Sequence, residues 1–335
     1  MKIFVYLEKS DIRGGIEIFA ERHVAELRAA GHEVEVANDI RRQTFDGFDE
    51  IVIHKCSDVA ALEMFPPEKT TYYVHDHEPI CPRGYAYTPL RHNCTMASGI
   101  WPCLFCAPAC RAWKAALRRV FSQTRRKRAM ARFKKVVVIS EFMKSRLVVN
   151  GIPPERIEVK PPVLDVGNAE SQSRRENNSS TISAPLRLCV EKIDLLYVGQ
   201  LIRGKGVQLL LKAMSLMETE RTLDLVGTGN MEQKLRTIAA GLGLAERVRF
   251  RGFQSNPLDW MRRAACVVVP SFWQEPYGLV AAEAVALNRP VVAFAIGGLP
   301  EACGGKATLV KAGDVRALAS ALDRLALLDR EDLQW

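Results

Sequence analysis

The sequence contains no apolar run long enough to cross a lipid bilayer. Its longest runs, such as the one at 266–270, fall far short of the roughly 18 residues that a span requires. The beginning, MKIFVYLEKSD, has no basic segment ahead of its apolar residues, so it indicates a buried strand and not a signal peptide. These absences favour a cytoplasmic protein.

Three motifs that hold nucleotides or their metal ions are also missing. No G-x-x-x-x-G-K-[ST] sequence is present, which disfavours a P-loop NTPase. The first strand does not lead into a full G-x-G-x-x-G sequence. No D-x-D pair exists to hold a divalent cation on a nucleotide-sugar diphosphate. Side-chain cations would have to neutralise any bound diphosphate, and we expect no cofactor for catalysis.

Acidic residues are absent from the segment 111–135, which carries eleven Lys or Arg and dominates the net charge of +9. A cluster of this size usually has an anionic partner, although a solvated helix face is the alternative. Trp113, Leu117, Val120 and Phe121 add apolar side chains, a combination suited to an anionic membrane surface. We therefore expect a basic helix at 111–135 that places the protein peripherally on the inner face of the membrane.

The rest of the sequence alternates strand and helix patterns. Near-continuous Val and Ile runs followed by amphipathic helices are typical of parallel sheets covered on both faces. The 335 residues are enough for two such domains. Strands are expected at 2–7, 33–38, 50–55, 70–75, 135–140, 194–199, 222–227, 247–252, 266–271 and 290–294.

We predict an α/β protein with two Rossmann-like, doubly wound domains facing a cleft, because such folds bind ligands at the carboxyl ends of strands. The N-terminal domain covers 1–165 and includes a Cys-rich insertion at 78–110 as well as the basic helix. A polar linker covers 166–190. The C-terminal domain covers 191–335.

Three glycine-containing sequences follow strands of the second half: GQLIRGKG at 199–206, GTGNMEQKL at 227–235 and SFWQEPYGLV at 271–280. Glycine lets a backbone approach a ligand closely, and the free N–H groups of a following helix favour anions. Together these loops suit a phosphate-bearing nucleotide, although each alone is a weak signal. Arg203 and Lys205 are placed to neutralise a diphosphate.

Several stretches resemble glycosyltransferase family 4, whose members are retaining enzymes of the GT-B fold. GQLIRGKGVQLLLKA, DLVGTGNMEQKL, VRFRGF and PSFWQEPYGLVAAEAVALNRPVVAFAIGGLPE look like the C-terminal domain of that family. RGGIEIFAERHVAELRAAGHEVEV, YYVHDHEPICPR and VVVISEFMKSRLVVNGIPPERIEV resemble its N-terminal domain. The resemblance covers nearly the whole chain, and it implies a metal-independent hexosyltransferase that uses a nucleotide-sugar donor.

The resemblance assigns a role to each residue that matches a family motif. In the E-x7-E pair, Glu275 would lie against the transferred sugar, and Glu283 would accept hydrogen bonds from the ribose. His75, with His77 as a nearby competitor, would contact the sugar, while Lys205 and Arg203 would stabilise the diphosphate. The other donor-binding residues would be Gly14, Gly15, Gly199, Gly227, Gly229, Phe253, Tyr277, Gly278, Leu279 and Val280.

Two departures from the family pattern keep other functions open. Gln200 stands where the family usually has Arg, and the chain stops soon after the helix expected at 314–327. A non-catalytic relative or a sugar-nucleotide epimerase are therefore alternatives to a transferase acting on a lipid-linked or cell-envelope glycan. A basic nucleic-acid-binding protein is a further alternative, but it leaves Glu275 and Glu283 unexplained, so a nucleic-acid partner is not expected.

Five of the nine cysteines lie within thirty residues of one another, at positions 81, 94, 103, 106 and 110. Disulfides are not expected in the cytosol. Cys81, Cys94, Cys103 and Cys106 could supply four thiolates to a structural zinc ion that braces the insertion, with unligated thiols as the alternative.

Overall fold

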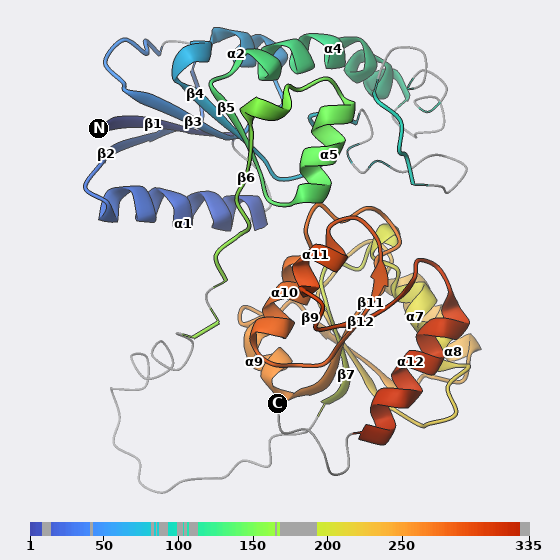
Figure 1. Cartoon of the computed structure of the whole chain (residues 1–335). Helices are drawn as coiled ribbons and strands as arrows, with labels where there is room; N and C mark the ends of the chain where they lie inside the picture. The colour runs from blue at the N-terminus through green and yellow to red at the C-terminus, as the bar shows by residue number, and fades with distance from the viewer. Residues whose placement is uncertain are drawn as a thin grey trace, which may run out of the picture. The chain divides into compact units, whose positions relative to one another are not determined.

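The computed structural model describes residues 1–8, 15–40, 43–81, 84, 86, 93–98, 103, 106, 113–164, 166–167 and 193–328. The chain divides into two compact units, Met1–Pro162 and Val163–Trp335. Each unit contains one six-stranded sheet with helices packed on it (Figure 1). The predicted linker at 166–190 lies outside the described residues apart from 166 and 167.

The sheet of the first unit has the strand order β2-β1-β3-β4-β5-β6, and every pair of neighbours is parallel. The order reverses between β1 and β3, the switch point of a doubly wound sheet. Its strands are β1 (Lys2–Leu7), β2 (Glu33–Ala37), β3 (Glu50–Lys55), β4 (Thr70–Val74), β5 (Lys135–Val138) and β6 (Ile157–Val159). Its helices are α1 (Gly15–Ala29), α2 (Val59–Met64), α4 (Trp113–Arg132) and α5 (Glu141–Val149), with short 3-10 turns η1 (Pro67–Lys69) and η3 (Pro154–Arg156).

Alternate residues of β1 pack on opposite faces of this sheet, as the period of two in a strand requires. Phe4 and Tyr6 join the core on the side of α2, α4 and α5. Ile3 and Val5 join a smaller core with Val24 of α1 on the other side (Figure 1). Both faces of β1 are therefore buried, which explains why the residues between its two ends are apolar.

The sheet of the second unit has the order β12-β11-β10-β7-β8-β9 and is also parallel throughout. Its order reverses between the adjacent strands β7 and β10. The strands are β7 (Ile193–Val198), β8 (Leu223–Val226), β9 (Val248–Gly252), β10 (Ala264–Val269), β11 (Val291–Ala295) and β12 (Thr308–Lys311). The helices are α7 (Val207–Met214), α8 (Glu232–Gly241), α9 (Pro257–Arg263), α10 (Leu279–Ala286), α11 (Leu299–Cys303) and α12 (Val315–Leu328), with the 3-10 turn η4 (Arg203–Lys205).

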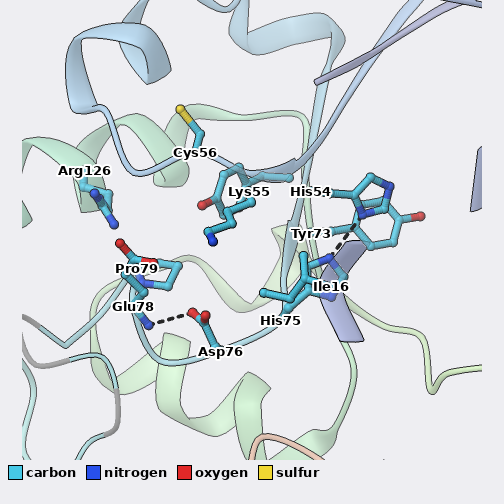
Figure 2. Close-up of a pocket in the computed structure, with 11 residues that line it drawn as sticks. Ile16, His54, Lys55, Cys56, Tyr73, His75, Asp76, Glu78, Pro79 and Arg126 are labelled. Carbon is cyan, nitrogen blue, oxygen red and sulfur yellow. Dashed lines mark hydrogen bonds between the residues drawn. The ribbon is translucent and has the colours of Figure 1, made fainter. Parts of the chain in front are cut away.

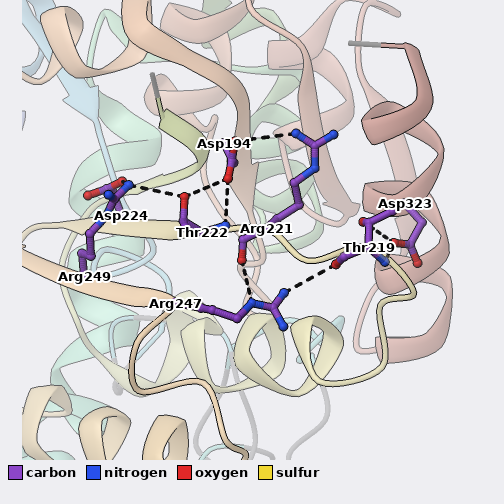
Figure 3. Close-up of polar contacts among 8 residues, drawn as sticks. All are labelled: Asp194, Thr219, Arg221, Thr222, Asp224, Arg247, Arg249 and Asp323. Carbon is purple, nitrogen blue, oxygen red and sulfur yellow. Dashed lines mark hydrogen bonds and ion pairs between the residues drawn. The ribbon is translucent and has the colours of Figure 1, made fainter. Parts of the chain in front are cut away.

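A buried carboxylate ties the edge strand β9 to its neighbour β8. Asp224 of β8 has no exposed surface, and its carboxylate pairs with Arg249 at 2.6 Å (Figure 3). It also pairs with Arg251 of β9. Asp194 of β7 accepts hydrogen bonds from the backbone and hydroxyl of Thr222 at 2.9 and 2.8 Å. The arginines of the VRFRGF sequence thus satisfy a buried charge within the unit, as a buried carboxylate requires.

Part of the basic segment has partners within the first unit. Arg125 of α4 forms an ion pair with Glu63 of α2. The buried Arg126 donates to the carbonyl oxygen of Ser57, and Lys127 donates to that of Ser98. These cations serve the packing of α4, so the number available to an outside partner is smaller than the sequence alone indicates.

The structure corrects the prediction for one of the four apolar residues of the basic helix that were expected to face a membrane. Val120 is only 1% exposed and belongs to the buried residues, whereas Phe121 is 59% exposed. The side chains of Trp113 and Leu117 lie outside the described residues. Within the part of the chain that the structure describes, no helix combines the length and apolar character needed to cross a membrane.

Candidate functional site

Lys205 and Glu275 meet at the switch point of the second sheet. The segment after β7 leads to Lys205 at the end of η4, and the segment after β10 leads to Glu275. Because β7 and β10 are parallel neighbours, the segments at their carboxyl ends lie together. The Lys205 ammonium donates to Oε1 of Glu275 at 2.7 Å. The fold therefore joins two predicted catalytic residues that are 70 positions apart.

Glu275 is held by three donors and is only 7% exposed. Besides Lys205, its Oε1 atom accepts hydrogen bonds from the Ser271 hydroxyl at 2.6 Å and from the Trp273 indole N–H at 3.1 Å. Burial acts to raise the pKa of the carboxyl group, but the Lys205 charge and these hydrogen bonds outweigh burial and lower it. Glu275 is thus an ionised, fixed carboxylate beside a cation at the carboxyl edge of the sheet.

The glycines of the predicted donor loops allow the chain to approach itself. A Cβ atom on Gly206, whose φ is +77°, would lie 1.8 Å from the carbonyl oxygen of Pro270. One on Gly227 would lie 2.0 Å from that of Gly199, and one on Gly229 would lie 2.4 Å from that of Leu201. From the sequence we expected these glycines to let the backbone approach a ligand. In the structure, the close contact between the loops themselves already requires glycine at these three positions.

Other predicted site residues of the second unit lie on or beside α10, after β9 and on η4. Gly278 precedes α10 with a φ of +111°, and Glu283 lies partly buried within that helix. Phe253 follows β9 and is 77% exposed, so it is not a core residue. Arg203 is exposed, and no described side chain forms an ion pair with it. Its guanidinium is available to an anion.

His75 lies in the first unit, at the carboxyl end of β4, and lines a partly open pocket (Figure 2). Lys55, Asp76 and Arg126 also line this pocket. Burial raises the pKa of Asp76 to about 6, so this carboxyl group takes up a proton more readily than usual. Of the two predicted glycines in this unit, Gly15 is the first residue of α1, and Gly14 lies outside the described residues.

A row of histidines continues from His75 into the first unit, and the sequence analysis missed it. Nε2 of His75 lies 3.1 Å from Nδ1 of His54, and Nε2 of His54 lies 3.0 Å from Nδ1 of His23. Nε2 of His23 lies 3.4 Å from the hydroxyl of Tyr73. His77, the predicted competitor, instead packs with its ring against Phe142. The available signal was His54, a polar residue inside the apolar strand EIVIHK.

Acid should destabilise the first unit through these histidines. Burial lowers the pKa of His54 to about 2 and of His75 to about 4, whereas unfolded histidine titrates near 6.5. Below pH 6.5 the unfolded chain therefore binds more protons than the folded chain, and the free energy of unfolding decreases as the pH is lowered. Protonation of Asp76 opposes this below pH 6, so we expect a net loss of about 1 kcal/mol per pH unit.

The measurement is the free energy of unfolding in urea between pH 7.5 and 5, where the ordinary carboxylates stay ionised. His54→Phe removes one of the titrating groups and should reduce the slope of stability against pH. An equal slope in the variant would contradict the assignment of the acid sensitivity to this row.

The structure describes all four cysteines of the predicted zinc site. Among the residues it describes, no group of three or more His, Cys, Asp or Glu side chains is arranged to hold a metal ion. Cys81, Cys94, Cys103 and Cys106 form no disulfide with a described residue, and Cys110 falls outside the described residues. The structural zinc site stays a prediction.

Part of the sequence matches known proteins. Residues 192–327 match the family model described as "Glycosyl transferases group 1". A D-inositol 3-phosphate glycosyltransferase of Streptomyces coelicolor is 34% identical over 204 residues, which cover 54% of this chain and 44% of the relative. An uncharacterized glycosyltransferase of Methanocaldococcus jannaschii is 37% identical over 110 residues, covering 32% of this chain and 28% of the relative. The chain spans less than half the length of these curated relatives.

Solved structures match over both units. Anabaena HepE in complex with UDP superposes with a TM-score of 0.66 at 20% identity, covering 98% of this chain and 91% of the other. WaaG, a glycosyltransferase involved in lipopolysaccharide biosynthesis, gives a TM-score of 0.61 at 16% identity, covering 97% and 90%. Together with the two parallel six-stranded sheets, this likeness confirms the predicted fold of two Rossmann-like domains.

Proposed function

We propose that this chain, whose residues 192–327 belong to the glycosyl transferases group 1 family, moves a sugar from a nucleotide-diphosphate donor to an acceptor hydroxyl and retains the configuration of the sugar. The observation that carries the proposal is the Lys205–Glu275 ion pair at the switch point of the second sheet. The HepE structure contains UDP in a chain of similar fold, which supports a nucleotide donor.

The donor would be bound mainly through its negative charge. The Lys205 ammonium and the exposed Arg203 neutralise the diphosphate, and the N–H groups at the start of α10 bind further oxygen atoms. Glu275 fixes the position of Lys205 and accepts a hydrogen bond from the transferred sugar, while Glu283 accepts from the ribose. Stabilising the charge on the departing diphosphate is then the main catalytic effect, and the departing phosphate takes the proton of the acceptor.

The acceptor would be a lipid-linked or cell-envelope glycan, with α4 resting on an anionic membrane surface. Arg118 and Arg128 of α4 are exposed, as is Phe121. Reversing both charges, as Arg118→Glu with Arg128→Glu, should weaken flotation with phosphatidylglycerol vesicles by tenfold or more, because each cation contributes about 1 kcal/mol. Flotation that does not depend on anionic lipid would contradict this part of the proposal.

The donor is tested by a thermal-shift screen against UDP, GDP and ADP sugars in the presence of EDTA. One nucleotide should raise the melting temperature by several degrees, because a ligand at 100 times its Kd adds about 2.7 kcal/mol of stability. Glu283→Ala should remove the shift, whereas Glu246→Ala, an exposed carboxylate of the same unit, should keep it.

The outcomes of the screen separate the alternatives. A shift that survives EDTA supports a donor site that works without metal, and transfer to a glycan acceptor then completes the proposal. A shift with no transfer to any acceptor would favour a non-catalytic relative. No shift with any nucleotide sugar would contradict the proposed donor site.

A further inference from the structure

Three imidazole rings and one phenol form a single row of hydrogen bonds in the first unit. The row runs from His75 on β4 through His54 on β3 to His23 on α1 and ends at Tyr73 of β4. Figure 2 shows the first contact of the row, between His54 and His75, at the edge of the pocket. The rings of His54 and His75 are stacked with an interplanar angle of 25°. Each ring of the row therefore has a fixed orientation toward the next.

The histidines of this row are neutral at physiological pH. Burial is the largest effect on all three, and it lowers each pKa, in His54 to about 2 and in His75 to about 4. The charged groups that act on these histidines are Glu17 and Glu26 of α1, Glu50 of β3 and Lys160 after β6, and their effects are smaller than burial. Glu158 of β6 acts in addition on Tyr73. A neutral imidazole carries one N–H and one bare nitrogen.

Each N···N contact between two rings holds one proton, so the tautomer of one ring determines the tautomers of the other two. If His54 donates from Nδ1 to Nε2 of His75, its own Nε2 must accept from Nδ1 of His23. The opposite direction reverses every bond in the row. A change of tautomer at one ring is therefore possible only together with the others.

Tyr73 selects the direction. Burial raises the pKa of its hydroxyl, so the hydroxyl keeps its proton. When the row points toward His75, this O–H donates to Nε2 of His23, and every proton between Tyr73 and His75 has an acceptor. When the row points the other way, the tyrosine proton has no acceptor in the row, which costs free energy for a buried polar group. The first direction is the stable one.

We propose that His54 and His23 are positioning residues that fix His75 as the Nδ1–H tautomer, so that His75 presents a neutral N–H donor to an oxygen atom of a bound sugar. No described residue hydrogen-bonds to Nδ1 of His75, which leaves that atom for a ligand. The fixed tautomer follows from the row itself, and only the role toward sugar rests on the proposed function. A donor that needs no reorientation loses no free energy when the sugar binds.

The test is the nitrogen chemical shifts of the histidine rings, measured by NMR on the whole chain at pH 7.5. The chain has only six histidines, so each signal can be assigned from a single substitution. Neutral histidine ordinarily prefers the Nε2–H tautomer. We expect His23, His54 and His75 to show the Nδ1–H tautomer instead.

Two variants test whether the row acts as a unit. Tyr73→Phe removes the hydroxyl that selects the direction and keeps the ring, and it should shift the tautomer ratio of His75 roughly fivefold, the effect of one lost hydrogen bond. Tyr72→Phe is the matched control, because the adjacent Tyr72 lies on the other face of the sheet and outside the row. It should leave the signals of His75 unchanged. His54→Phe should return His75 to the ordinary tautomer.

Activity provides the second readout. With the donor found by the thermal-shift screen, His54→Phe should lower kcat about 10- to 100-fold with little change in the KM of the donor. An Nε2–H tautomer of His75 in the unaltered protein, or no response to Tyr73→Phe, would overturn the proposal while transfer itself could stand. If the three histidines show the expected tautomers but the chain transfers no sugar, the proposed hydrogen-bond row stands and the proposed function is refuted.

Discussion

Glu275→Gln should lower kcat for sugar transfer by about 100- to 1000-fold while the chain stays folded. The amide oxygen can take the place of Oε1 and accept from Ser271 and Trp273, so the shape of the site is kept. The negative charge that fixes the Lys205 ammonium is lost, however, and the cation can move away from the diphosphate. Steady-state kinetics with the identified donor and a thermal melt of the same sample measure both effects.

Two comparisons show whether the charge is responsible. Glu246→Gln makes the same chemical change at an exposed carboxylate of the second unit and should leave kcat unchanged. Lys205→Met should lose activity like Glu275→Gln, and adding it to Glu275→Gln should cost little more, because the two side chains act as a unit. A Glu275→Gln variant with the kcat of the unaltered protein would refute the proposed site.

Gly206→Ala should destabilise the second unit by more than about 4 kcal/mol, which corresponds to a loss of roughly 10 °C or more in melting temperature. The new Cβ atom would lie 1.8 Å from the carbonyl oxygen of Pro270, so η4 must move away from the chain that follows β10. That movement also breaks the hydrogen bond from the N–H of Phe272 to the carbonyl oxygen of Gly204 at 3.1 Å. Transfer activity should fall together with stability, because Lys205 lies next to Gly206.

Gly243→Ala is the matched control for the backbone conformation. Gly243 has a φ of +71°, close to that of Gly206, but a Cβ atom there would meet nothing within 4 Å. Its substitution should cost only about 1 kcal/mol, the strain of a left-handed residue. Equal losses for the two variants would mean that strain, and not the close approach to Pro270, explains the need for glycine.

The elements that the sequence predicted well are those whose patterns are long and regular. The apolar runs at 2–7 and 50–55 became β1 and β3, and the apolar residues that recur with a helical period in 16–30 lie in α1. Gly31, which follows this helix, has a φ of +82°, and the next residue donates back to the carbonyl oxygen of Leu27 at 3.1 Å. Such signals are local, so no tertiary information is needed to see them.

The strands that were missed are short edge strands. β6 contains Glu158 among its three residues, and β12 covers only Thr308–Lys311. Each joins its sheet through a single neighbour. With so few apolar residues, their pairing depends on the finished sheet more than on their own sequence.

The amino-acid sequence by itself determined that the chain forms two α/β units, which segments contain most of their strands, and which loops follow the strands of the second sheet. Only the tertiary structure decided that Lys205 pairs with Glu275. It also decided that three cations of α4 have partners within the first unit, and that His54 and His23 continue a row of hydrogen bonds from His75. The physical reason is that periodicity reports which face of an element is buried, whereas a contact between distant residues depends on the order of strands in the sheet. Many strand orders suit the same apolar pattern, and packing selects one of them.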